Sequence, residues 1–273
     1  MKHLSINTLS LTALLFVAGV CEPSSKALAQ GRRISLPPQA AQIAQGIYDL
    51  GLARDADGTI VQGFAFVHYK KDFARPDKPG GAKPPKTSSC YAFLAAGAKW
   101  KGVPEPFIFD ETVPDAGARL SLVSTAIGTW EAAAAGKDIL GDGIVAPVSI
   151  EVARTLNGFN EVTFGSFVDD PYVIAMTTVW GVWGGPPAGR HLVEWDMVFG
   201  DDSWNWWYNV GTPDTTFTDF LSIATHEIGH AMGMDHPSDS CTEETMYAFS
   251  GWSETKKRDL NDGDIAGIRK LYP

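Results

Sequence analysis

The sequence predicts an α+β domain over residues 90–273, preceded by a small N-terminal segment. Two observations predict it: short runs rich in β-branched and aromatic residues, and stretches in which apolar residues recur at helical spacing. The predicted strands lie at 107–110, 148–152, 162–164, 172–179 and 192–199. At 273 residues and 44% hydrophobic, the chain can bury a full core and still carry a smaller appendage.

Residues 1–29 have the pattern of a secretory signal. Lys2 and His3 open it, an apolar run covers 9–20, and Ala27-Leu28-Ala29 supplies a cleavage site before Gln30. The apolar run is too short to span a bilayer, so the mature protein is expected to be secreted. Lipidation at Cys21 and retention in the periplasm are less favoured alternatives, since a valine before that cysteine fits a lipidation site poorly.

Residues 30–89 differ in character from residues 90–273. Residues 39–52 could form a short helix, and the alternation over 59–69 predicts a strand. Prolines and glycines then make residues 75–86 a linker.

Three helices are expected in the rest of the chain. The first covers 114–136, ends at a glycine, and places Leu120, Val123, Ile127 and Trp130 on one face. Thr218 or Asp219 caps the second helix, which continues through 226–230. The last helix starts within 261–264 and ends at Tyr272.

The second of these helices carries the most specific pattern in the chain, H-E-I-G-H-A-M-G-M-D-H. His226 and His230 are four residues apart, so on a helix they lie one turn apart on one face. Gly233 can end the helix with a positive φ, which lets His236 turn back toward the same point. Three histidine ligands with an open fourth position are typical of catalytic zinc, and Glu227 lies beside the first ligand.

This H-E-x-x-H-x-x-G-x-x-H motif resembles that of the metzincin zinc peptidases. Thr245-Met246-Tyr247 resembles the Met-turn of these enzymes, and residues 258–272 are similar to the closing helix of matrixin catalytic domains. The resemblance extends weakly to about Cys90. It implies a matrixin-like domain with a mixed five-stranded sheet, zinc on the three histidines, Glu227 as general base, Met246 beneath the ligands, and hydrolysis of internal peptide bonds.

The chain also departs from animal matrixins. Over 166–195 it has only His191, so we expect no second zinc site. A structural calcium ion is an open expectation, because acidic side chains are present without a recognisable spacing; the candidates are Asp169, Asp170, Asp196, Asp201 and Asp202. Gly263 replaces the first of two aspartates found in many matrixins, which leaves Asp264 to support the Met-turn.

Two cysteines remain after removal of the signal, Cys90 and Cys241. An even pair in an oxidising compartment favours a disulfide. The alternative is a cysteine switch, in which a pro-segment thiolate fills the open zinc position. Residues 87–91 do not match the motif in which matrixins carry such a switch.

The N-terminal segment 30–89 is interpreted as a pro-segment of a zymogen, which would cover the active site until it is cut near the exposed linker. The alternative is a passive extension. His68 could be an inhibitory ligand in this segment, although a lone histidine in a strand is more often structural or exposed.

Net charge is −10 and no basic run appears, which argues against nucleic acid as a partner. No further stretch is apolar enough to span a membrane, and a monomer acting on protein or peptide substrates is expected. Two other functions stay open: a zinc-bearing adhesin that binds through the tryptophan-rich stretch 180–207, and an amidase acting on cell-wall peptides. The sequence sets no cleavage preference.

Overall fold

The computed structural model describes residues 32–70, 89–149, 151–201 and 204–273. The expected signal, Cys21, the Pro/Gly linker and Asp202 lie outside these residues. No helix in the described part of the chain combines the length and apolar character that crossing a bilayer requires.

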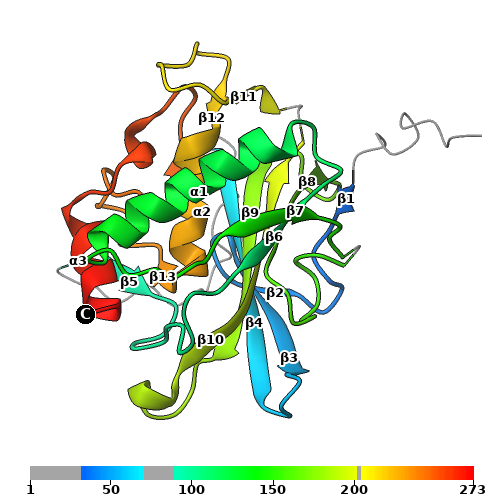
Figure 1. The fold of residues 1–273 in the computed structure, drawn as a ribbon, viewed down its shortest axis with the longest axis vertical. Helices are drawn as coiled ribbons and strands as arrows, with labels where there is room; N and C mark the ends of the chain where they lie inside the picture. Colours follow the sequence, from blue (N-terminus) through cyan, green and yellow to red (C-terminus); the bar gives the residue numbers. More distant parts are fainter. Residues whose placement is uncertain (1–31, 71–88, 150, 202–203) are drawn as a thin grey trace, which may run out of the picture. The chain divides into compact units, whose positions relative to one another are not determined.

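Figure 1 shows the elements. The helices are α1 (Ala116–Ala133), α2 (Phe220–Ala231) and α3 (Asp262–Leu271), with 3-10 turns η3 (Pro187–Gly189) and η5 (Lys256–Arg258). The longer strands are β3 (Ile47–Arg54), β4 (Ile60–Lys70), β8 (Glu161–Phe167), β9 (Val173–Val182) and β10 (His191–Gly200). The shorter strands are β1 (Arg33–Ile34), β2 (Ala41–Ala44), β5 (Ala92–Phe93), β6 (Phe107–Asp110), β7 (Gly143–Ala146), β11 (Trp206–Trp207), β12 (Thr218–Asp219), β13 (Met234–Asp235) and β14 (Phe249–Ser250).

Within the described residues, ten strands form one mixed sheet, with the order β2-β3-β4-β9-β10-β8-β6-β7. In addition, β1 pairs with β8 and β14 pairs with β4. Strands β6 to β10 of the predicted domain lie side by side in this sheet, and strands of the N-terminal segment extend it beyond β9. Pairing with β4 satisfies the backbone N–H and C=O groups that β9 would otherwise expose at a free edge.

Two local predictions are wrong. Residues 39–52 form no helix; β2 and β3 make a hairpin there, with Gly46 at φ 69° in the turn. Pairing of β3 with β4, from Ile47 opposite Phe66 to Arg54 opposite Ile60, overrides the local helical preference. The strand expected at 148–152 is replaced by β7, which pairs in parallel with β6.

The sheet separates two apolar cores. The helices cover one face (Figure 1), where α1 and α2 pack together and the Trp130 indole donates to the carbonyl of Thr225 at 2.7 Å. Side chains of β4 alternate between the cores: Phe66 joins the helix-side core, while Ala65 and Val67 join the opposite one. Strand β4 therefore presents one row of side chains directly to α2.

Candidate metal centre

Helix α2 positions the first two histidines. Asp219 caps it as predicted, accepting a hydrogen bond from Ser222 N at 2.9 Å. His226 and His230 follow on one buried face, both fully enclosed. Gly233, at φ 100°, ends the helix where an added Cβ would lie 3.0 Å from the Ala98 carbonyl oxygen, so only glycine fits without strain.

The chain then turns back so that three imidazoles converge. The Nε2 atom of His236 lies 3.3 Å from that of His226 and 3.2 Å from that of His230. Nitrogen ligands placed tetrahedrally at about 2.0–2.1 Å from zinc are about 3.4 Å apart, so the spacing fits one ion. The three side chains form a group that could hold a metal ion.

The hydrogen bonds of Nδ1 in His226 and His230 show that Nε2 is the nitrogen available to bind a metal. His226 Nδ1 donates to the Thr245 carbonyl at 2.7 Å, and His230 Nδ1 donates to the Met234 carbonyl at 3.0 Å. A carbonyl can only accept, so Nδ1 carries the proton and Nε2 keeps a lone pair for a metal. Burial lowers the pKa of His230 to about 3 and keeps all three rings neutral, the form that binds metal.

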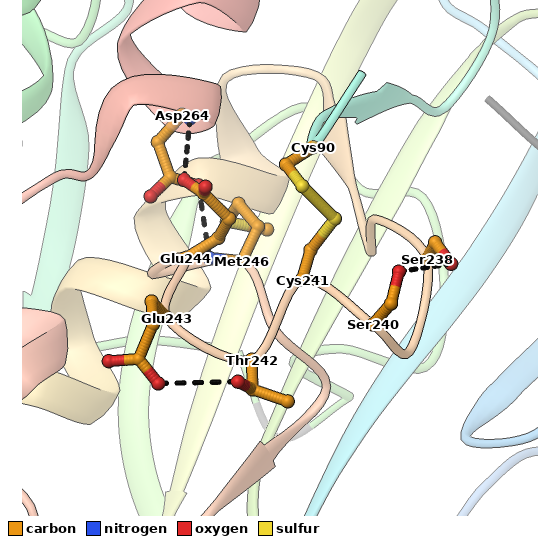
Figure 2. The surroundings of a disulfide bond; sticks show 9 residues. All are labelled: Cys90, Ser238, Ser240, Cys241, Thr242, Glu243, Glu244, Met246 and Asp264. Atoms are coloured by element: carbon orange, nitrogen blue, oxygen red, sulfur yellow. Dashed lines mark hydrogen bonds between the residues drawn. A yellow bond between two sulfur atoms is a disulfide. The ribbon is translucent and has the colours of Figure 1, made fainter. Parts of the chain in front are cut away.

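A tight turn lies beneath the ligands. Tyr247 N donates to the Glu244 carbonyl at 3.1 Å, and Met246 between them is fully buried against Gly229 of α2, where a side chain would collide with the methionine sulfur. Asp264 holds this turn, as predicted, by accepting from Thr245 N at 2.6 Å. It also accepts from Met246 N at 3.2 Å (Figure 2). The carbonyl that orients His226 therefore belongs to a turn fixed by α3.

Glu227 lies beside the histidine cluster with no exposed surface. One carboxylate oxygen accepts from Thr177 Oγ1 at 2.6 Å, and the other lies 3.1 Å from His68 Nδ1. Burial raises the pKa of Glu227 to about 8. A carboxyl group with that pKa can gain or release a proton near neutral pH.

Comparison with known proteins agrees with this geometry. The Matrixin peptidase family model matches residues 189–273. Residues 189–273 are therefore similar to matrixin domains, and we call them the matrixin domain. Matrix metalloproteinase-16 of Rattus norvegicus is 33% identical over 72 residues, 26% of this chain and 11% of the relative. Matrilysin of Homo sapiens is 45% identical over 53 residues, which are 19% of this chain and 19% of the relative. Metalloendoproteinase 1 of Glycine max is 46% identical over 61 residues, which are 22% of this chain and 19% of the relative. The chain thus spans a fifth or less of the length of these relatives.

Cys90 and Cys241 form the predicted disulfide near the turn that contains Met246 (Figure 2). It ties the chain two residues before β5 to the loop between His236 and Met246. The Cys90 thiol is thereby engaged, which removes the cysteine-switch alternative in this structure. The Cys90 carbonyl also occupies the space where a side chain at Gly263 would project. This position therefore has no room for the aspartate that many matrixins carry there.

Two residues that touch the candidate metal centre, Thr177 and Lys257, were not assigned to it from sequence, and a third, His68, was considered only as an inhibitory ligand. Thr177 carries no local signal. Lys257 is fully buried, with Nζ 3.3 Å from His226 Nδ1, and burial lowers its pKa to about 7. His68 is 1% exposed and its ring contacts that of His226, with centroids 4.3 Å apart. The exposed alternative for His68 is therefore wrong.

The tryptophan-rich stretch is largely structural. Trp195 is fully buried, and Trp206 also lies in the core against Phe199 and Phe220. These two rings are therefore not available to bind a partner, which weakens the adhesin alternative. Trp204 packs near Trp252, and both rings lie around the Lys70 ammonium.

Three of the carboxylates considered for calcium are engaged with other groups. Asp196 is fully buried and accepts from Ala153 N at 3.0 Å and Glu161 N at 3.1 Å. Asp170 accepts from Tyr172 N at 3.1 Å, and Asp201 bonds to Ser166 Oγ. Calcium remains a prediction without support from the described residues.

Proposed function

We propose that this chain is a secreted zinc-dependent endopeptidase that hydrolyses internal peptide bonds, with Glu227 as general base. This proposal depends on the convergence of the three histidine Nε2 atoms beside the buried carboxyl group of Glu227. Secretion rests on the signal pattern at 1–29.

Zinc on His226, His230 and His236 would supply a Lewis acid that polarises a carbonyl and lowers the pKa of a water to about 7. The protein's contribution is to hold the three rings in one tautomer and orientation through backbone carbonyls. We assign Met246 to the Met-turn, where it forms an apolar floor under the rings and ligates nothing.

Glu227 moves the proton. As a carboxylate it removes a proton from the attacking water, and as a carboxylic acid it delivers that proton to the nitrogen of the departing amine. The pKa of about 8, raised by burial, suits both steps because neither protonation state is strongly disfavoured near neutral pH. Thr177 holds one carboxylate oxygen in place and so orients the other.

The variant Glu227→Gln tests this assignment. It keeps the shape of the side chain but cannot carry the proton, so we expect about one bound zinc per chain and turnover of a quenched fluorescent peptide reduced by at least about 10²-fold. The exposed Glu243 offers a matched control, because Glu243→Gln should change neither quantity. Absence of stoichiometric zinc in the unaltered protein, or substantial turnover by Glu227→Gln, would contradict the proposal.

A further inference from the structure

A groove with a volume of about 610 Å³ lies between β5 and α3 (Figure 1). It has an aromatic and aliphatic floor and two lysines at its border; the lining residues that matter here are Tyr91, Phe93, Ala96, Leu271, Lys99 and Lys270. Strand β5 pairs with β13, which ends one residue before His236. The groove is therefore separate from the three histidines, but it lies on the strand pair that leads into the metal centre.

The floor of the groove is held in place by its surroundings. The rings of Tyr91 and Phe93 lie 5.4 Å apart. Tyr91 also packs against α3 at Gly267, where an added Cβ would lie 2.9 Å from the tyrosine Cβ. The disulfide fixes the preceding residue, Cys90. Both rings are only half-buried, so they offer apolar surface that a ligand can cover without first ordering the site.

Two lysines border this apolar floor. Lys270 Nζ donates to the Tyr91 hydroxyl at 3.4 Å and lies 5.6 Å from the centroid of that ring. Lys99 Nζ lies 5.9 Å from the centroid of the Tyr272 ring. In the described part of the chain neither ammonium forms an ion pair with an acidic side chain, and no residue that lines the groove is acidic. On a protein with a net charge of −10, the groove is thus a locally positive site.

We propose that this groove binds an acidic peptide segment that carries an aromatic side chain. The aromatic ring covers Tyr91 and Phe93, because such a ring buries a large apolar area in one residue. Carboxylates of the same segment accept charge-assisted hydrogen bonds from Lys99 and Lys270. This binding does not presuppose the peptidase activity proposed above, so it can be tested separately.

The neighbouring part of this chain does not have the charge of such an occupant. Residues 71–88 contain five basic residues and two acidic ones, namely Lys71, Arg75, Lys78, Lys83 and Lys86 against Asp72 and Asp77. Their net positive charge is repelled by Lys99 and Lys270. Charge complementarity therefore favours an acidic peptide from another molecule over this basic segment.

Isothermal titration calorimetry tests the proposal with the peptide Gly-Glu-Phe-Glu-Glu-Phe-Gly. All titrations use the full chain with Glu227→Gln, so that the peptide stays intact. The pair Lys99→Glu and Lys270→Glu should weaken binding by at least about tenfold, since two attractions become repulsions. The matched control is Arg33→Glu with Arg54→Glu, which changes the net charge equally at exposed positions outside the groove and should change the affinity by less than about twofold.

Two altered peptides test which features the groove recognises. Replacing each glutamate by lysine, or each phenylalanine by alanine, should weaken binding by at least about tenfold. Equally tight binding of either altered peptide overturns the inference, and so do equal affinities of the groove variant and its control. Failure of the acidic peptide to bind overturns it as well, including the case in which residues 71–88 exclude the peptide. Should circular dichroism show that the groove variant does not fold, Lys99→Gln with Lys270→Gln takes its place with the same expected outcomes.

Discussion

Residues 189–273 and residues 32–70 both reach the metal centre, but by different means. In the matrixin domain the three histidines proposed as ligands and the proposed general base, Glu227, fall within eleven consecutive residues, and a helix followed by a glycine turn brings them together. His68 of the N-terminal segment meets Glu227 across 159 positions of sequence, through strand pairing alone. A site can therefore be recognisable from a local motif while a strand that contacts it carries no motif.

The two regions are also held in place by different interactions. The matrixin domain is fixed by a disulfide, by a buried aspartate under its turn, and by a capped helix. The N-terminal segment is fixed by antiparallel pairing, by close packing of glycine on tryptophan, and by a buried lysine at its end. Each set of contacts can be weakened separately.

Removing the disulfide should have the largest effect. It closes a loop between residues 151 apart, so Cys90→Ser with Cys241→Ser should lower the free energy of unfolding by about 2–5 kcal/mol. Urea denaturation followed by circular dichroism measures this change. The unaltered protein treated with dithiothreitol provides the control and should unfold at the same urea concentration as the double variant. An unchanged midpoint would show that the loop after His236 needs no covalent support.

The contact between β4 and β9 can be broken at Gly63. An added Cβ would lie 2.8 Å from carbons of the Trp180 ring, so Gly63→Ala should lower the free energy of unfolding by about 1–3 kcal/mol through overpacking. Gly128→Ala is the control, since that exposed helical glycine has no atom within 4 Å of the new methyl group and should gain up to about 1 kcal/mol. Equal unfolding midpoints for the two variants would mean that β4 is not packed tightly on β9.

Lys70, at the end of β4, joins the two regions because it contacts Thr218 and Trp252 of the matrixin domain. Its ammonium lies 2.8 Å from the Trp252 ring centroid, and burial lowers its pKa to about 7. Between pH 7 and 10 the unfolded chain keeps this proton while the folded chain releases it, so stability rises with pH. From pH 7 to 8 the unaltered protein should gain about 1 kcal/mol relative to Lys70→Met, measured by urea denaturation at each pH. Parallel pH profiles would show that this lysine keeps its usual pKa.

Much of the metal centre could be predicted because its signals are local. The four-residue histidine spacing, the glycine at positive φ and the capping aspartate each depend on neighbours in the chain. Asp264, 19 positions from Thr245, could be predicted only from the resemblance to matrixins. The pairing of Cys90 with Cys241 could be predicted from the count of cysteines. By contrast, the prediction of a helix over residues 39–52 is wrong, because the pairing of this segment with β4 cannot be inferred from its own apolar residues.

The sequence by itself determined which side chains can bind a metal and where the helix that carries them begins and ends. These properties depend on helical geometry and on glycine's freedom at one position. The tertiary structure was needed to show that Thr177, His68 and Phe66 surround that site and that strands of residues 32–70 join the described sheet. The physical reason is that a strand pairs with whichever backbone edge lies beside it in space, and the sequence of a strand does not specify which other strand that will be.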